Sequence, residues 1–455
     1  MDMHLSPRDS GLLLRLLPIE LTVYILSYLD CKTLRKCSLV TRAWLSASRY
    51  HLFKTVKYHF RVQRLMGDGI EGIAHLPLED LLEFFMSSPS VPSHIRHMKL
   101  VMDTVVLRGQ TPEEAFPPVP VRLDTLYAIL QHTTALSTLT LKSVRFRSSD
   151  ISAPSLLLRV PAIEHLESIR IDCQGMWRAR IEDSVFPILQ MVGTVDELVT
   201  TVWNSSASFS EPIFPPPSRR DKQLRELHVP SGTIARRLET VADFSHLQLL
   251  DITSLEEGEF PWLCGILAMV GSNMRHLHFH LHDHMRIRVP ILALDPLAHL
   301  DLLDLTGLSN LETLSLSLPV FINLSEPFTE TSTFYLYKPS HDFLKRVLSF
   351  LPESLRTIGL RVHIERAAIE SELRGTVLAT VLHPWTEIDS ILAARIAGRG
   401  LKKVEIDIDA IRSRVVPHLP PRCMTLALPK VSAADALWLR GFTLAHKFQS
   451  WGGLN

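Results

Sequence analysis

Short segments in which apolar and polar residues alternate recur along most of the chain, and helix-like stretches lie between them. The segments follow the pattern L-x-x-L-x-L and start at Ile95, Leu136, Leu166, Leu224, Leu247, Met274, Leu311, Leu355, Leu401 and, more loosely, Cys423, with Asp196–Trp203 as a degenerate further copy. Alternation with period two predicts a β-strand in each segment. Helices are expected at Leu123–Gln131, Val185–Val192, Trp262–Val270, Asp342–Leu351 and Ile388–Ala397.

Repetition of a strand and a helix predicts a parallel sheet with helices outside it. Successive segments start 22 to 46 residues apart. Ten or eleven such units are more than a doubly wound domain needs, and they favour a solenoid of stacked units. An ordinary α/β domain is the alternative architecture.

The N-terminal segment Leu17–Val56 has a different pattern, which predicts a helix over Leu17–Leu29 with Pro18 in its first turn. Its apolar residues form two stripes, one of Leu17, Leu21, Ile25 and Leu29 and one of Ile19, Val23 and Leu26. A helix that is apolar nearly all round must be covered on both sides, which a module of about 40 residues cannot achieve alone. We therefore expect one face to be buried by the chain itself and the other to be offered to a partner.

This segment resembles an F-box. The matching positions are LP-x-EL at Leu17–Leu21, IL-xx-L at Ile25–Leu29, Leu34, Cys37, the pair Leu39-Val40, Arg42, Trp44 and LF-xx-V at Leu52–Val56. The resemblance implies about three short helices that dock onto the Skp-type adaptor of an SCF-type cullin–RING ubiquitin ligase, with the chain as substrate receptor. The alternative is an amphipathic helical hairpin whose second face packs on its own C-terminal domain.

The resemblance also implies a set of residues that contact the adaptor or shape the module. They are Leu17, Pro18, Leu21, Ile25, Leu26, Leu29, Leu34 and Val40. The sequence does not separate these two roles. Trp44 is expected to anchor the third helix in the core of the module.

The repeated units are similar to leucine-rich repeats, which often accompany F-boxes, although nearly all copies lack the usual Asn and several are longer than usual. The predicted fold class is α/β, with a small all-α three-helix module followed by an irregular leucine-rich-repeat-like solenoid with a parallel sheet. The expected organisation is a flexible arm at 1–13, the F-box at 14–58, a helical linker at 59–94 with a helix at Leu78–Met86, the solenoid at 95–430 and a C-terminal cap at 431–455.

Composition narrows the possible functions. Of the 455 residues, 46% are hydrophobic and 21% charged, so most of the chain can bury a core. Lys+Arg and Asp+Glu both number 48, which gives no reason to expect nucleic acid or an acidic membrane as partner. Five scattered cysteines without C-x-x-C indicate free thiols in a reducing compartment. No secretory signal is recognised and the longest uncharged run, Phe260–Met274, is too short to span a bilayer, so a soluble cytoplasmic or nuclear protein is expected.

The strand pattern also predicts a binding face, because the leucines face the core while the residues between and just after them face the concave surface. This face is polar and mixed in charge. The candidate contacts to an unknown target protein are Thr138, Thr140, Arg170, His228, His276, His278, His280, Arg361, Glu405 and Asp407. Lys142, Arg170 and Arg361 would suit a phosphate if they met, but nothing in the sequence brings them together.

A run of alternating histidines extends from His276 to His284. On a strand, His276, His278 and His280 would share one face at about 7 Å spacing. This geometry suits a transition metal, a partner contact whose charge changes between about pH 5 and 8, or simply polar residues on a solvent-facing strand. No H-E-x-x-H and no second ligand cluster accompany it, so no metal is assigned.

Enzyme signatures are absent from the sequence, which contains no G-x-x-x-x-G-K-[ST], G-x-G-x-x-G or G-x-S-x-G motif. We therefore expect no catalytic residues and no cofactor. The leading hypothesis is a substrate-recruiting F-box subunit whose partners are the Skp-type adaptor, the cullin scaffold and a target protein. The alternatives are a leucine-rich-repeat-like binding scaffold without a ligase role, and a metal-dependent enzyme centred on the histidine strand.

Overall fold

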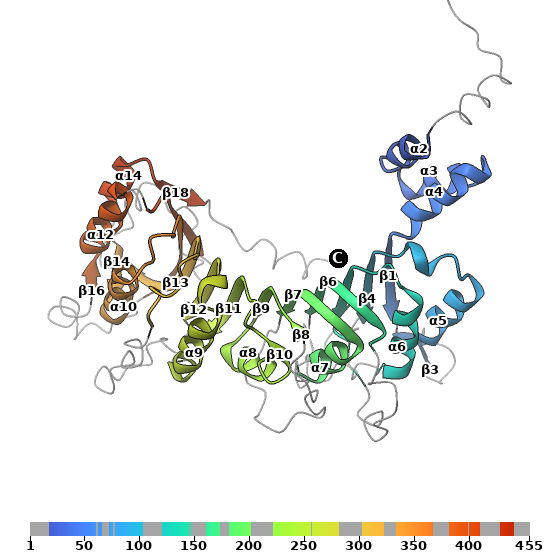
Figure 1. The fold of residues 1–455 in the computed structure, drawn as a ribbon, viewed down its shortest axis with the longest axis horizontal. Coiled ribbons are helices and arrows are strands. Elements are labelled where there is room, and N and C mark those ends of the chain that lie inside the picture. The colour runs from blue at the N-terminus through green and yellow to red at the C-terminus, as the bar shows by residue number, and fades with distance from the viewer. Residues whose placement is uncertain are drawn as a thin grey trace, which may run out of the picture. The chain divides into compact units, whose positions relative to one another are not determined.

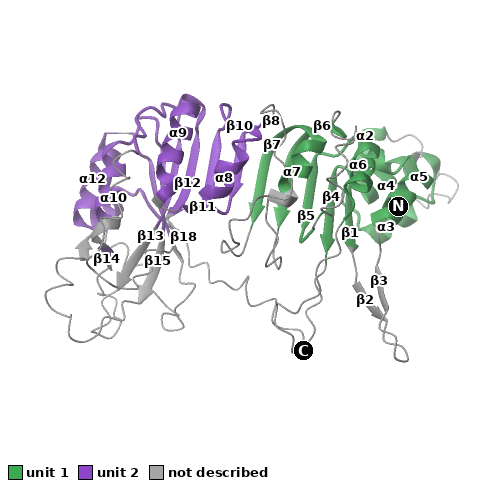
Figure 2. Ribbon diagram, turned by 90° about the horizontal axis from the view of Figure 1, so that it is seen from below, with its two compact units in different colours: residues 1–222 green, residues 223–455 purple. Residues whose placement is uncertain are grey.

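The computed structural model describes residues 18–60, 62–65, 72–75, 78–102, 121–144, 146, 161–172, 182–201, 222–255, 257–281, 303–322, 334–366, 382–398, 400–409 and 428–440. These residues belong to two compact units, Met1–Lys222 (unit 1) and Gln223–Asn455 (unit 2), which Figure 2 shows in green and purple. Each unit combines parallel strands with helices, and unit 1 carries an additional helical module at its start.

The helical module consists of α2 (Ile19–Leu26), α3 (Cys31–Cys37) and α4 (Arg42–Phe53). Polar side chains start two of these helices. The Asp30 carboxylate accepts a hydrogen bond of 2.7 Å from the Thr33 amide at the start of α3, and Thr41 Oγ1 accepts one of 3.2 Å from the Trp44 amide at the start of α4. Such caps satisfy amides that have no partner within the helix.

The core of the module is small. Its buried residues are Leu26, Leu34, Cys37 and Ala47, with Val23, Leu29, Trp44 and Leu52 packed against them. The ring of His51 on α4 also lies 2.8 Å from the carbonyl oxygen of Val23 on α2. The expected role of Trp44 as a core anchor of the third helix is confirmed.

The sheet of unit 1 has five parallel strands in the order β1-β4-β5-β6-β7. Their bounds are Thr55–Phe60, His97–Met102, Thr138–Lys142, Ile163–Asp172 and Val192–Thr201. The other elements are α5 (Leu78–Ser87), η1 (Pro92–His94), α6 (Leu123–His132), α7 (Glu182–Met191) and a hairpin of β2 (Val62–Leu65) and β3 (Gly72–His75). Strand β1 follows directly after α4, so the helical module leads into the edge of this sheet.

The sheet of unit 2 has seven parallel strands in the order β9-β11-β12-β13-β15-β17-β18. Their bounds are Glu226–Val229, Leu249–Leu255, His276–Leu281, Thr313–Ile322, Thr357–Arg366, Lys403–Asp409 and Leu437–Arg440. Helices α8 (Gly232–Leu238), α9 (Phe260–Val270), α10 (Lys338–Ser349) and α12 (Thr386–Ala397) lie along one side of these strands, as Figure 1 shows. Two short strands, β14 (Phe334–Tyr337) and β16 (Leu382–Pro384), add an antiparallel extension to β13.

Most strands begin two residues after the first apolar residue of their L-x-x-L-x-L segment. Leu136, Leu247 and Leu311 are buried, and each donates its amide to a carbonyl three residues earlier. The first leucine thus fills a tight turn, and alternation starts after it. The next apolar residues, such as Leu277 and Phe279 on β12, are fully buried.

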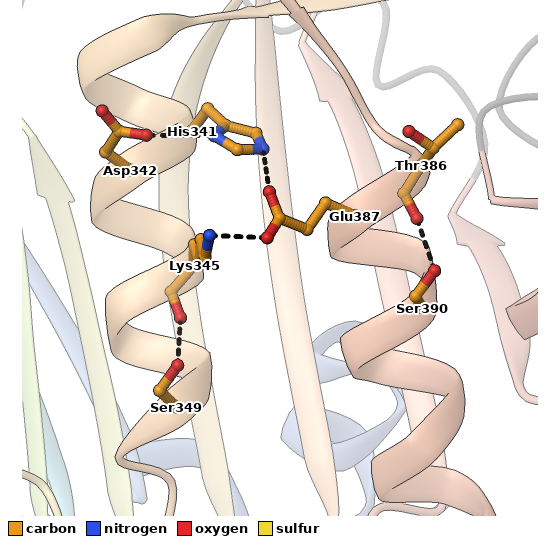
Figure 3. Close-up of polar contacts among 7 residues, drawn as sticks. All are labelled: His341, Asp342, Lys345, Ser349, Thr386, Glu387 and Ser390. Atoms are coloured by element: carbon orange, nitrogen blue, oxygen red, sulfur yellow. Dashed lines mark hydrogen bonds and ion pairs between the residues drawn. The ribbon is translucent and has the colours of Figure 1, made fainter.

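Neighbouring helices of unit 2 are tied together by a polar cluster (Figure 3). The Glu387 carboxylate on α12 lies 2.5 Å from Lys345 Nζ and 3.6 Å from His341 Nε2, both on α10. The pKa of Lys345 is raised and that of Glu387 lowered, in each case chiefly by their mutual hydrogen bond. Farther along α12, the buried Asp389 accepts hydrogen bonds from the amides of Lys430 and Val431 and so caps α14 (Pro429–Ala433). These contacts hold α10, α12 and α14 as one layer.

The predicted arrangement, a helical module followed by a parallel sheet with helices, is confirmed. All five repeat helices and the linker helix are present with shifted ends, and the degenerate copy at Asp196 lies in β7. Strands β1, β2, β3, β14, β16 and β18 were not predicted, because their segments lack the L-x-x-L-x-L pattern; β2 and β3 form a hairpin within the stretch expected to be a helical linker. The loose copy at Cys423 lies almost entirely outside the described residues. None of the described helices has the length and apolar composition needed to cross a membrane.

Candidate functional site

The helical module exposes a surface that is unusually apolar. Seven of the twelve exposed large hydrophobic residues in the described chain lie between Ile19 and Val40. We use the name "apolar surface" for six of these residues, namely Leu21, Tyr24, Ile25, Tyr28, Leu39 and Val40. Exposed apolar residues concentrated on a small module are typical of a protein-binding surface.

Helix α2 places four of these residues on one side. Leu21 and Ile25 are one helical turn apart. Tyr24 in the helix and Tyr28, which lies just beyond its end, have the same spacing. Leu21 is 49% exposed and Ile25 is 43% exposed, whereas Leu26 on the opposite side is fully buried. The helix therefore divides into one side that builds the core and one that has no cover within the described chain.

The two tyrosines form a pair on this side. Tyr28 donates a hydrogen bond of 2.6 Å to the Tyr24 hydroxyl oxygen, and their rings pack edge to face with centroids 5.1 Å apart. This hydrogen bond raises the pKa of Tyr28 above its ordinary value. The pair is rigid and amphipathic, which suits a binding surface because little side-chain entropy is lost on contact.

The turn between α3 and α4 supplies the other part of the apolar surface. Leu39 is 85% exposed, and Val40 beside it is also exposed. Neither residue belongs to a helix, and neither packs against the module core. A large aliphatic side chain this exposed contributes no burial energy to the free protein.

The residues expected to contact the adaptor or shape the module fall into two groups. Pro18, Leu21, Ile25 and Val40 are exposed, whereas Leu26 and Leu34 are buried and Leu29 is half-buried against the core. Leu17 lies outside the described residues. Tyr24, Tyr28 and Leu39 are also exposed but were not among the expected contacts, although Leu39 was one of the matching F-box positions. The spacing of four residues that links Leu21 to Ile25 also links Tyr24 to Tyr28, and this signal could have found the pair.

A second candidate surface is the side of each sheet that the helices do not cover. In unit 1 the register aligns Thr138 with Ser168 and Thr140 with Arg170, so these side chains share the outward face. Arg170 pairs with Glu197 at 3.2 Å, and Lys142 lies 3.9 Å from Asp172. The predicted residues Thr138, Thr140 and Arg170 thus lie on one face of unit 1.

In unit 2, one row of the register crosses the whole outward face. It runs through His228, Asp251, His278, Ser315, Gly359, Glu405 and Trp438. His228 Nδ1 lies 3.0 Å from Asp251 Oδ2. Burial opposes ionisation of Asp251, but the hydrogen bond with His228 and the nearby histidines lower its pKa overall. Burial, only partly offset by Asp251, lowers the pKa of His278, so that this ring is neutral at pH 7.

The next row up holds Ser317, Arg361 and Asp407. Arg361 Nε lies 3.3 Å from Asp407 Oδ2. Within the described residues, three buried polar atoms on this face have no hydrogen-bond partner, namely His278 Nε2, Ser317 Oγ and Asp407 Oδ1. Beside them Lys403 contacts Glu405 and lies 4.5 Å from the ring centroid of Trp438, which is 57% exposed.

The histidine strand is β12. His276, His278 and His280 face outward between the buried Leu277 and Phe279, as expected, and His282 and His284 lie outside the described residues. Within the described chain, the three imidazoles do not form a cluster with metal-ligand spacing. Arg361 lies in a different unit from Arg170 and Lys142, so the three cations are spread over both sheets.

Together, the module and the sheets define a protein with an N-terminal helical module that exposes apolar residues, followed by an α/β repeat region with a polar outward face. Residues 14–58 match the F-box-like family, and the chain therefore carries an F-box-like domain. This match covers the helical module and the start of β1. No curated protein matches the chain.

Proposed function

We propose that this protein is the substrate-recognition subunit of an SCF-type ubiquitin ligase. In this proposal the F-box-like domain docks onto a Skp-type adaptor, which links it to the cullin scaffold, and the outward faces of the sheets bind a target protein. The chain itself performs no covalent chemistry. It acts by holding the acceptor lysine of the target close to the transferring enzyme.

The observation that carries this proposal is the apolar surface of the F-box-like domain. Leu21 and Ile25 are about half exposed on the side of α2 opposite the core residue Leu26. Fully burying an exposed aliphatic side chain contributes about 1.5–3 kcal/mol, and covering a half-exposed one contributes roughly half of that. An adaptor that covers α2 and the turn at Leu39 and Val40 would therefore gain enough apolar burial for a stable complex.

We assign the predicted module residues according to burial. Pro18, Leu21, Ile25 and Val40 contact the adaptor, together with Tyr24, Tyr28 and Leu39. Leu26, Leu29 and Leu34 act indirectly, because they fix the three helices in the orientation that presents this surface. The polar outward residues contribute target contacts, for which charged and hydroxyl groups supply specificity.

A pair of double variants of the full-length chain tests the adaptor assignment. Replacing Leu21 and Ile25 with Asp should abolish co-purification with the Skp-type adaptor, since covering two unpaired carboxylates costs several kcal/mol. The matched control replaces Phe84 and Met86 with Asp, because these exposed apolar residues lie on α5 outside the F-box-like domain. The control should retain the adaptor.

Circular dichroism should show that both variants keep the helix and strand content of the wild type, because all four side chains are exposed. Equal retention of the adaptor by both variants would contradict the assignment. If the wild type itself ignores the adaptor, the scaffold function without a ligase role replaces the proposal.

A further inference from the structure

Two lysines on the outward face of unit 1 have no ion-pair partner among the residues that the structure describes. Lys57 on β1 lies directly opposite Lys99 on β4 in the parallel register. Lys99 is in turn opposite Thr140 on β5, and Thr140 is opposite Arg170 on β6. Three cations and one hydroxyl thus occupy a single row across four neighbouring strands.

The cations in this row differ in their partners. Arg170 is paired with Glu197, and two residues after Thr140 on β5 the side chain of Lys142 is near Asp172. Neither Lys57 nor Lys99 has a carboxylate partner within the described part of the chain. The outward positions of β1, β4 and β5 hold no acidic residue at all, and they include Thr138 and Thr140.

Like charges directly opposite on adjacent strands, about 4.8 Å apart, destabilise a sheet. Lysine on an edge strand discourages edge-to-edge aggregation, which accounts for Lys57 on the edge strand β1. It does not account for Lys99, which lies on an interior strand. An anion bound between the two ammonium groups would remove this repulsion.

We propose that the Lys57–Lys99 pair, with the hydroxyls of Thr138 and Thr140, binds an acidic segment of the target protein through its Asp or Glu side chains. This inference rests on the proposed function, since it names the chemistry of the target that unit 1 receives. Ammonium groups supply charge-assisted hydrogen bonds to carboxylates, and the threonines supply neutral donors beside them. The site begins at β1, the strand in which the F-box-like match ends.

Fluorescence anisotropy of the full-length chain with labelled peptides tests the proposal. The probes are a glutamate-rich peptide, a Gly/Ser peptide with one phosphoserine, and a lysine-rich peptide. The glutamate-rich peptide should bind, and higher salt should weaken this binding. The K57E/K99E variant should weaken binding about tenfold or more. The control R236E/K402E changes the net charge equally at exposed residues of unit 2 and should stay within about twofold of the wild type.

Several results would overturn the proposal. These are no binding of the glutamate-rich peptide, equal losses in both variants, preference for the lysine-rich peptide, or binding of the phosphoserine peptide alone. If K57E/K99E does not fold, K57Q/K99Q must show the loss instead. Adaptor binding is measured on the same samples. Loss of peptide binding with adaptor binding intact separates this site from the ligase role, and a wild type that binds peptide but no adaptor contradicts only the ligase role.

Discussion

His228 and Asp251 form a hydrogen-bonded pair across neighbouring strands, with His228 Nδ1 3.0 Å from Asp251 Oδ2. His278 on β12 lies in the same row. The negative charge of Asp251 partly offsets the lowering of the His278 pKa by burial. The outward face of unit 2 thus couples two imidazoles through one carboxylate. Because the pKa values of Asp251 and His278 are both lowered, the stability of the free protein depends on pH.

Acidification should destabilise unit 2 through His278. Burial lowers the pKa of His278 below the unfolded value of 6.5, so the unfolded chain binds more protons in the interval between the two values. Stability is therefore full above pH 6.5 and falls as the pH drops through the folded pKa. Asp251, whose pKa is also lowered, adds a second loss below about pH 3.8.

Thermal unfolding between about pH 7 and pH 5.5 measures the first effect. Between these two pH values, the melting temperature of the H278Q variant should fall by less than that of the wild type. H132Q, which alters an exposed histidine at the end of α6, is the control and should behave as the wild type does. An unchanged pH dependence in H278Q would contradict the assigned role of burial.

Core and surface leucines of the F-box-like domain should respond differently to truncation. Leu26→Ala removes a fully buried side chain and should cost about 2–5 kcal/mol. Leu21→Ala removes a half-exposed one and should cost about 0.5 kcal/mol or less. Hydrogen exchange of α2, α3 and α4 in the full-length chain measures both, and similar exchange rates in the two variants would show that the module is not built as described.

Two glycines offer a matched test of packing. A Cβ at Gly193 at the start of β7 would lie 2.2 Å from the carbonyl oxygen of Glu164 on β6, so Gly193→Ala must push two strands apart, at a cost of about 1–3 kcal/mol. A Cβ at Gly265 on α9 meets no atom within 4 Å, and Gly265→Ala should gain about 0.5–1 kcal/mol. Denaturant unfolding compares them, and a neutral Gly193→Ala would contradict the close approach of β6 and β7.

The repeating part of the fold could be predicted because its local and tertiary patterns agree. Leu277 and Phe279 alternate with histidines, and a strand covered on one side by helices buries the first set and exposes the second. Strands β14 and β16 could not be predicted in this way. Their segments are short, and their pairing depends on β13 extending past its repeat, which is tertiary information.

The candidate sites were predictable as faces but not as contacts. Period-two alternation placed His228 and His278 on one side, but only the register shows that Asp251 lies between them. In the same way, the two stripes on α2 separated Ile25 from Leu26 but did not show which of the two is buried, because an all-round apolar helix has no sequence signal for the side that the chain covers. The Lys57–Lys99 row was missed, since Lys57 lies in the F-box-like segment and the strand register that joins it to Lys99 is not local.

The most direct test of the account is a calorimetric titration of the full-length chain with a Skp-type adaptor at several temperatures. We expect a complex with one adaptor per chain and a negative heat-capacity change, because binding covers the apolar surface around Leu21, Ile25 and Leu39. Absence of binding, or binding that L21D/I25D leaves unchanged, would contradict the claim that the exposed side of α2 is an adaptor-docking surface.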